Sequence, residues 1–372
     1  MTSKELKEAT PRNMAAATIL NVDAVFIALL ALTLIVLVVT GLAATQYAVI
    51  PAASDSDALI PRGDDGWLIR YVHSRAVTTL FGLTCLRLAL ALLAFDFGEG
   101  RRLAWLCWAS WLWAAIFIAL SGTAATGLQG DYWFSILTTS LLTYWFQLRS
   151  GVGYWLSMAV MDPRGHQLTL LHGMVAGSAV TFSCGVLLAA RRRVVARLSA
   201  ISWPAPLALC AVILAGSAVT AWLMAWPAPF DNPDNLFVAD PGQTPEHIIP
   251  EWYIAPWFGM VRTVPSKGAA SIVLWIGPLL PLLITLLPRP RLLPTRIILT
   301  LATSLLIIAL IALSTIGRRG YDPLLQIPGR TLTLFYFAYF VVFVPLLTLV
   351  DRAFWSDERE GQSGKFGALR TG

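Results

Sequence analysis

Long runs of apolar residues, separated by shorter polar connections, dominate this chain. Each run holds enough residues to cross about 30 Å of hydrocarbon at about 1.5 Å per residue in a helix. The runs cover residues 23–47, 67–95, 103–128, 167–190, 203–226, 269–288, 293–316 and 331–351. The pattern therefore predicts an all-α membrane protein with about eight transmembrane helices. An even number of spans places both termini on the same side of the membrane.

The connections between these runs alternate in charge. One set carries basic residues: Lys4, Lys7, Arg12, Arg101, Arg102, Arg191, Arg192, Arg193, Arg197, Arg289, Arg291 and Arg296. Because basic residues collect on the cytoplasmic side of membrane proteins, both termini are expected in the cytoplasm. The opposite connections, 48–66, 129–166, 227–268 and 317–330, are longer and richer in aspartate. Long ordered loops over a membrane scaffold often cap a site, so we expect function on this outer face.

A basic stretch near the middle of the chain marks a domain boundary. The residues from Arg191 to Arg197 are followed by Trp203-Pro204-Ala205-Pro206. We therefore expect a front four-helix bundle within residues 1–197 and a rear four-helix unit within residues 198–372.

Composition excludes several other classes of protein. Of the 372 residues, 57% are hydrophobic and only 13% are charged, whereas a soluble domain carries about a quarter charged residues. The net charge of +6 lies in short clusters between the apolar runs, which indicates topology and argues against a nucleic-acid partner. The four cysteines lie in apolar runs without a CxxC pair, so zinc, iron–sulfur and covalent heme c sites are not supported. The first apolar run is far longer than a signal-peptide core and is expected to remain as a span.

Two of the four histidines lie at matched depth in the predicted bundle. His73 follows the start of the second run and His172 follows the start of the fourth, so both enter from the outer face. An imidazole pair of this kind suits axial ligation of a heme iron from both sides. The alternative is that each histidine is hydrogen-bonded to a backbone carbonyl, and the residues alone leave both interpretations open.

The neighbours of this pair favour a heme. Gly41 and Gly127 fall near the outer ends of the first and third runs, where a flat porphyrin needs helix surface without side chains. Arg70, three residues before His73, is placed to pair with a heme propionate. Glycines are also common in membrane helices, and arginines also anchor helices at the interface, so each feature alone is weak.

A carboxylate and two aromatic residues stand together in the outer connection between the fifth and sixth runs. Glu251 can accept a phenolic proton while Trp252 and Tyr253 wall an apolar slot, which suits quinol chemistry. In a partly apolar site the pKa of Glu251 is expected to rise. The alternative is a structural loop retained without quinone chemistry.

These segments resemble cytochrome b of the quinol-oxidising cytochrome bc complexes. Residues 232–267 carry the most specific elements, above all Pro250-Glu251-Trp252-Tyr253, and Thr40-Gly41-Leu42, the segment from Gly66 to His73 and Thr315-Ile316-Gly317 support the match. The resemblance implies a heme b held by His73 and His172. It also implies an outer quinone site formed by the 250–253 motif, where Glu251 accepts the proton beside Tyr253. The family usually forms dimers, so a homodimer within a complex is expected.

Departures from the family pattern concern the inner, cytoplasmic side. The family carries second heme-ligating histidines and second glycines about fourteen residues, or about 21 Å, from the outer ones. Here those four positions hold Arg87, Val186, Ile27 and Trp113. Four concerted replacements predict that the inner heme is absent and its cavity filled, with Arg87 extending to the cytoplasmic interface. Near the outer site, Gln167 replaces an expected arginine.

A single heme predicts a particular function. Electrons cannot follow the two-heme path to an inner quinone site, so a full Q-cycle is not expected. Exchange would be local, with quinol or quinone and with a periplasmic iron–sulfur or c-type cytochrome subunit or a larger oxidoreductase. The expected location is a bacterial inner membrane. The alternative function is a heme-free structural membrane anchor or quinone-docking subunit; a transporter is poorly supported, because no inverted repeat is evident.

Overall fold

The computed structural model describes residues 11–44, 67–97, 101–146, 172, 173, 176 and 232–354. Within these residues the chain is helical, with one isolated antiparallel bridge between Leu128 and Val238. The α-helices are α2 (Pro11–Ala44), α3 (Trp67–Leu93), α4 (Arg102–Ala124), α5 (Gln129–Phe146), α9 (Ala255–Thr263), α10 (Lys267–Ile276), α11 (Leu293–Arg318) and α12 (Gln326–Ala338). Short 3-10 segments are η2 (Pro233–Leu236), η3 (Gly277–Leu286) and η4 (Pro323–Leu325), and η5 (Tyr339–Phe343) is a π-helical turn inside the last long helix.

Six of the described helical stretches are long and apolar enough to cross a membrane. They are Phe26–Ala44, Leu68–Leu93, Arg102–Thr123, Lys267–Leu286, Leu293–Arg318 and Pro323–Phe354. Each matches one of the runs predicted from sequence, so the all-α membrane fold is confirmed. The predicted spans at 167–190 and 203–226 lie almost entirely outside the described residues.

One prediction about the outer connections is wrong. Residues 129–166 were expected to form a loop, but the first 18 of them form α5. Its buried residues Phe134, Ser135, Thr138 and Leu141 recur at helical spacing, and this face packs against α4 and α10. Ser271 of α10 donates a hydrogen bond to the carbonyl oxygen of Leu141 at 2.6 Å. The run was too short and too polar to count as a membrane span, so a search for long apolar runs missed it.

The contacts divide the chain into two compact units. The first contains residues 1–50, 60–83 and 166–231, and the second contains 51–59, 84–165 and 232–372. Helix α3 therefore contributes its first part to one unit and its last ten residues to the other. The expected boundary near residue 197 lies outside the described residues and stays a prediction.

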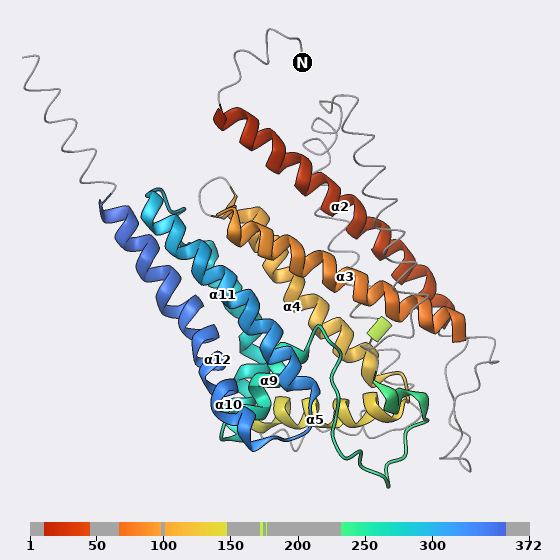
Figure 1. Ribbon diagram of the computed structural model, residues 1–372. Coiled ribbons are helices and arrows are strands. Elements are labelled where there is room, and N and C mark those ends of the chain that lie inside the picture. The colour runs from red at the N-terminus through yellow and green to blue at the C-terminus, as the bar shows by residue number, and fades with distance from the viewer. Residues whose placement is uncertain are drawn as a thin grey trace, which may run out of the picture. The chain divides into compact units, whose positions relative to one another are not determined.

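Close backbone contact organises the second unit. In Figure 1 the short helices α9, α10 and α5 gather at one end of the long helices α11 and α12. Helices α9 and α11 meet through glycines, because a Cβ atom on Gly259 would meet the carbonyl oxygen of Leu313 and one on Gly317 would meet that of Ala255. This contact gives Gly317, part of the 315–317 motif, a steric reason to lack a side chain. It also fixes α9, which directly follows the Glu251 turn, against a long membrane helix.

Candidate functional site

The two histidines predicted to form a pair lie close together in the first unit, with their rings nearly perpendicular. The ring centroids of His73, on α3, and His172 are 6.4 Å apart, with an angle of 85° between the ring planes. A metal–imidazole bond is about 2 Å long, so two such bonds plus the distance from each ring centre to its nitrogen roughly span this gap. The pair therefore has the separation that one iron held between two imidazoles requires.

Helix α2 lies directly against the first of these rings. The hydroxyl of Thr40 is 3.0 Å from Nδ1 of His73. A Cβ atom on the next residue, Gly41, would lie 3.2 Å from Cε1 of the same ring. That distance is tighter than an ordinary van der Waals contact, so the glycine allows the imidazole to pack against the helix backbone.

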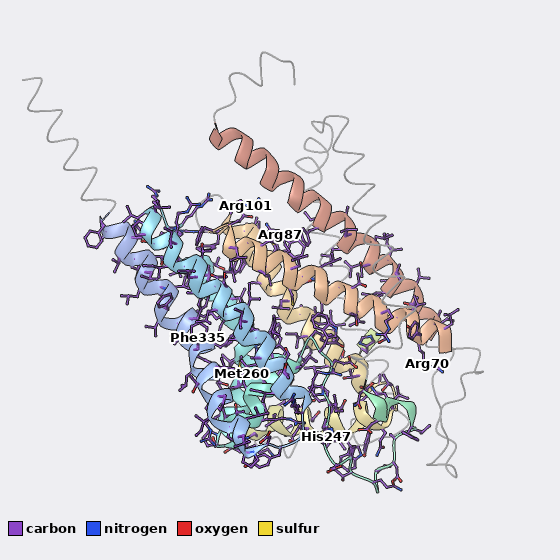
Figure 2. The ribbon with its side chains drawn as sticks, in the orientation of Figure 1. Arg70, Arg87, Arg101, His247, Met260 and Phe335 are labelled. Atoms are coloured by element: carbon purple, nitrogen blue, oxygen red, sulfur yellow. The ribbon has the colours of Figure 1, made fainter. Side chains whose placement is uncertain are left out.

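Arg70 and Arg87 mark the two ends of α3, as Figure 2 shows. Arg70 lies one turn before His73 and is half-buried, so its position on the helix agrees with a role at the outer edge of the site. Arg87 lies near the inner end. Arg70 therefore lies near the histidine pair along α3, whereas Arg87 lies far along the same helix.

The glycine predicted from the third span has a different setting. Gly127 lies after the end of α4 and has a positive φ of 67°, which glycine adopts most readily. Its carbonyl oxygen accepts a hydrogen bond from the backbone of Ala239 in the outer loop at 2.9 Å. The positive φ of this turn gives Gly127 a backbone reason to be glycine.

The 250–253 motif forms a tight turn that leads into α9. The carbonyl oxygen of Glu251 accepts hydrogen bonds from the backbone of Ile254 at 3.0 Å and Ala255 at 2.9 Å. Arg318, at the end of α11, donates to the carbonyl oxygen of Pro250 at 3.1 Å. The turn is therefore held at both ends, with the side chain of Glu251 half-buried.

Tyr253 is the buried member of this turn. Its ring is 6% exposed and packs edge-on against Trp252 at 5.8 Å. Burial, followed by the nearby carboxylates of Glu251 and Asp131, raises the pKa of Tyr253 well above its ordinary value. The phenol therefore stays protonated at neutral pH.

Asp131 is a buried carboxylate that the sequence analysis did not single out. Its two oxygens accept hydrogen bonds from Thr126 at 2.8 Å and from the amide of Asn235 at 2.9 Å. Its own backbone amide donates back to Asn235 at 3.0 Å. At Gly130 a Cβ atom would collide with the side chain of Asn232. These contacts hold the start of α5 against the loop that carries the 250–253 motif. The only signal for this contact in the sequence was the dipeptide Gly130-Asp131.

At the inner end, the expectation for Arg87 is wrong. Its guanidinium is 4% exposed and pairs with Asp96 at 2.7 Å, instead of extending to the interface. Arg101 binds the same carboxylate through two nitrogens at 2.7 and 2.8 Å. Asp96 follows Phe95, which has a positive φ of 53°, so three charged groups secure a strained turn between α3 and α4. Asp96 could be seen in the sequence as a possible partner, but only the turn between α3 and α4 brings it close to Arg87.

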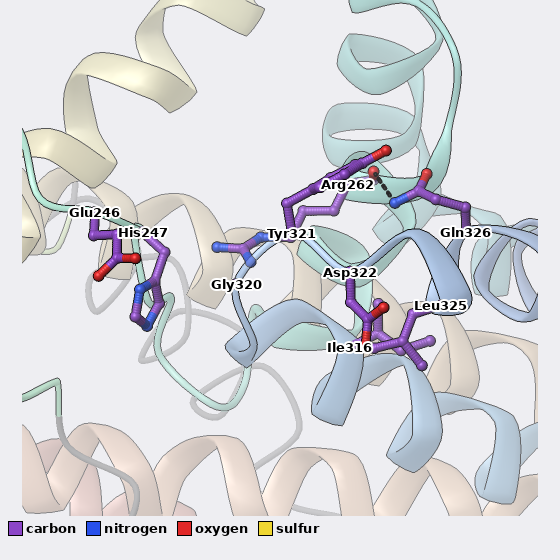
Figure 3. Close-up of a pocket in the computed structure, with 9 residues that line it drawn as sticks. All are labelled: Glu246, His247, Arg262, Ile316, Gly320, Tyr321, Asp322, Leu325 and Gln326. Atoms are coloured by element: carbon purple, nitrogen blue, oxygen red, sulfur yellow. Dashed lines mark hydrogen bonds between the residues drawn. The ribbon is translucent and has the colours of Figure 1, made fainter.

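A separate cavity lies on the second unit, with a volume of about 210 Å³ (Figure 3). Glu246 and His247 line it from the loop, and Asp322 lines it from the connection after α11. Arg262 of α9 also lines it, but its guanidinium donates to the carbonyl oxygen of Ile248 at 2.5 Å. Burial lowers the pKa of this arginine. Neither Glu251 nor Tyr253 lines the cavity, so it is distinct from the 250–253 turn.

Comparison with known proteins identifies relatives along most of the chain. Residues 238–337 match the family described as Cytochrome b(C-terminal)/b6/petD. The chain is 25% identical over 349 residues to cytochrome b of Epidermophyton floccosum, covering 88% of this chain and 86% of that protein. It is also 25% identical over 355 residues to cytochrome b of Neurospora crassa, covering 88% and 89%.

Among solved structures, a chain of a hyperthermophilic respiratory Complex III shares the fold. The TM-score is 0.67 at 22% sequence identity, and the match covers 88% of this chain and 91% of that chain. The similarity therefore extends over both of the compact units and is not confined to the motif.

Proposed function

This chain belongs to the cytochrome b family, and from that premise we propose that it carries electrons in a membrane redox complex by means of a single b-type heme. The heme lies between His73 and His172. Electrons are exchanged with quinol or quinone at an outer-face pocket beside Glu251. The observation that carries the proposal is the 6.4 Å separation of the two imidazole rings.

The residues of the first unit suit a heme. When bound, the group supplies a reversible one-electron centre. His73 and His172 would hold the iron, Gly41 lets the ring of His73 pack against the backbone of α2, and Arg70 would pair with a propionate. The sequence assigns Gly127 to the porphyrin surface.

The 250–253 turn supplies the quinone chemistry. Glu251 accepts the phenolic proton of a quinol, and Tyr253, which keeps its own proton, donates a hydrogen bond to an oxygen of the ring. Pro250 and Trp252 wall the apolar slot. Because Arg318 and the start of α9 hold the backbone of this turn, the carboxylate is presented in a fixed direction.

The absence of an inner heme completes the proposal. Arg87 stands where a second ligand would be and is committed to Asp96. Val186, Ile27 and Trp113 occupy the other inner positions, and the ring of Trp113 stacks on Phe117 at 5.8 Å. A route for electrons from the outer heme to an inner quinone is missing, so a full Q-cycle does not operate.

The partners follow from this geometry. A periplasmic iron–sulfur or c-type cytochrome subunit, or a larger oxidoreductase, exchanges electrons with the outer site, and the chain forms a homodimer within that complex. The basic connections support a location of both termini in the cytoplasm, and the membrane we propose is a bacterial inner membrane. Residues 1–197 form the heme unit and residues 198–372 the unit that carries the quinone turn.

A pyridine hemochromogen assay on the purified chain tests the proposal. We expect one heme b per chain, lost in His73→Ala and in His172→Ala and kept in the control His247→Ala, which changes a histidine at the outer cavity. A result of no heme in the unaltered chain would favour the structural anchor or quinone-docking function. A result of two hemes would refute the account of residues 27, 87, 113 and 186.

A further inference from the structure

The hydroxyl of Thr40 makes two contacts that together define its role. It lies 2.7 Å from the carbonyl oxygen of Val36, one turn earlier on α2, and 3.0 Å from Nδ1 of His73. A second carbonyl, that of Leu37, is more distant at 3.4 Å. Carbonyl oxygens only accept hydrogen bonds, so the hydroxyl hydrogen points toward Val36.

That arrangement determines which nitrogen of His73 carries its hydrogen. A hydroxyl has one hydrogen and two acceptor lone pairs. With the hydrogen of Thr40 directed at Val36, the oxygen can only accept from the imidazole. Nδ1 of His73 must then be the protonated nitrogen, and Nε2 keeps the lone pair that a metal needs.

The same helix also limits rotation of the ring. Gly41 lies against Cε1 of His73 closely enough that even one added carbon would crowd it. The ring edge between Nδ1 and Cε1 therefore contacts α2 at two successive residues. Nε2, the next ring atom after Cε1, makes neither of these two contacts.

We propose that Thr40 is a positioning residue that holds His73 in its Nδ1-protonated form and directs Nε2 to the heme iron. This inference rests on the proposed function. By accepting the Nδ1 hydrogen, Thr40 makes the imidazole a stronger electron donor, which stabilises the ferric heme relative to the ferrous heme. Removing the acceptor should therefore make the heme easier to reduce.

The test compares Thr40→Val, which keeps the shape of the side chain and removes the hydroxyl, with Thr40→Ser, which keeps the hydroxyl. A redox titration should show a roughly threefold to tenfold higher ratio of reduced to oxidised heme at a fixed potential in the valine variant. That is a rise of about 30–60 mV, since a tenfold change corresponds to about 59 mV for one electron. The serine variant should stay near the unaltered protein, and the ferric electron paramagnetic resonance spectrum should shift only in the valine variant.

Thr33 supplies a matched control on the same helix. It is buried and donates to the carbonyl oxygen of Leu29 at 2.8 Å in the same way, and Thr33→Val should leave the potential and the spectrum unchanged. An unchanged potential in Thr40→Val, or an equal shift in Thr33→Val, would overturn the inference.

Heme content distinguishes a failure of the proposed function from a failure of the role inferred for Thr40. An unaltered chain without heme refutes the proposed function itself. If heme is present and Thr40→Val loses it, retention by Thr40→Ser supports the positioning role, and loss from Thr40→Ser overturns it.

Discussion

Glu251 and Tyr253 stand two residues apart in one turn, yet Tyr253 is buried and Glu251 is half-buried. The phenol is buried and its pKa is raised by burial and by the carboxylates of Glu251 and Asp131. A phenol that keeps its proton does not act as a base, which agrees with the proposed role of Glu251 as the acceptor of the quinol proton.

Glu251→Gln should therefore slow quinol oxidation by about 100-fold or more, the usual contribution of a general base. The amide keeps the size of the side chain but cannot take up a proton. The rate of heme reduction after mixing with quinol, measured by stopped flow, reports the effect. Heme content should stay at the level of the unaltered chain, and a rate close to that level would refute the role.

Tyr253 should also set part of the alkaline stability limit. Its raised pKa means that the unfolded chain releases the phenolic proton first, at about pH 10. The stabilisation is fully present below that pH and is lost as the pH rises above it. Thermal unfolding of Tyr253→Phe should thus depend less on pH in this range, while Tyr321→Phe, at a tyrosine that is 78% exposed, should follow the unaltered protein.

At the scale of elements, the inner turn between α3 and α4 depends on one carboxylate. Asp96 accepts three hydrogen bonds from Arg87 and Arg101, and its side chain is 4% exposed. Phe95, directly before it, adopts the left-handed backbone that only a well-held turn tolerates. Arg296 of α11 also lies over the ring of Phe95 at 5.3 Å. The charge cluster therefore links the ends of two helices and supports a third.

Asp96→Ala should destabilise the chain by about 3–5 kcal/mol, because it leaves a buried arginine without its partner. Replacing the fully buried pair, in Arg87→Met with Asp96→Leu, should cost less than the single change, because the buried charge of Arg87 is then removed as well and the remaining Arg101 is 20% exposed. Denaturation in detergent, monitored by tryptophan fluorescence, measures the loss of stability in the single and in the double variant. Equal costs would show that the ion pair itself holds the turn.

Arg87→His should not create a second heme site. The change restores one ligand type at the inner position, but Val186 cannot ligate, and Asp96 loses a charged partner. The hemochromogen assay should still give one heme per chain, at lower thermal stability. A second heme in this variant would show that the inner cavity is still open, contrary to the packing of Trp113.

At the scale of the whole molecule, the proposed single heme would limit electron transfer across the membrane. In proteoliposomes that contain the chain and its outer partner, quinol oxidation should move no electron to the inner side. A potential-sensitive dye should then report no charge movement attributable to inward electron transfer, although the outer acceptor is reduced. Proteoliposomes that contain a two-heme cytochrome b complex, measured in parallel, give the positive control. An equal signal from this chain would refute the single-heme account.

Much of the fold could be predicted from the sequence because lipid imposes a simple rule. A segment in hydrocarbon must be long, apolar and helical, so runs such as 269–288 and 293–316 could be located from hydropathy alone. Helix α5 escaped the same rule, because half of its surface is polar and it satisfies its apolar face by packing on α4 and α10. Its helical spacing was visible in the sequence, but its partners were not.

The sequence by itself determined the membrane fold, the small set of histidines that could bind heme and the Pro-Glu-Trp-Tyr turn, since each depends on residue type and local spacing. The tertiary structure alone decided which polar groups meet. It brought Thr40 to His73, Asp131 to Asn235, and Arg87 to Asp96. Hydropathy states that a polar side chain needs a partner away from water, but only the packing of helices distant in sequence selects that partner.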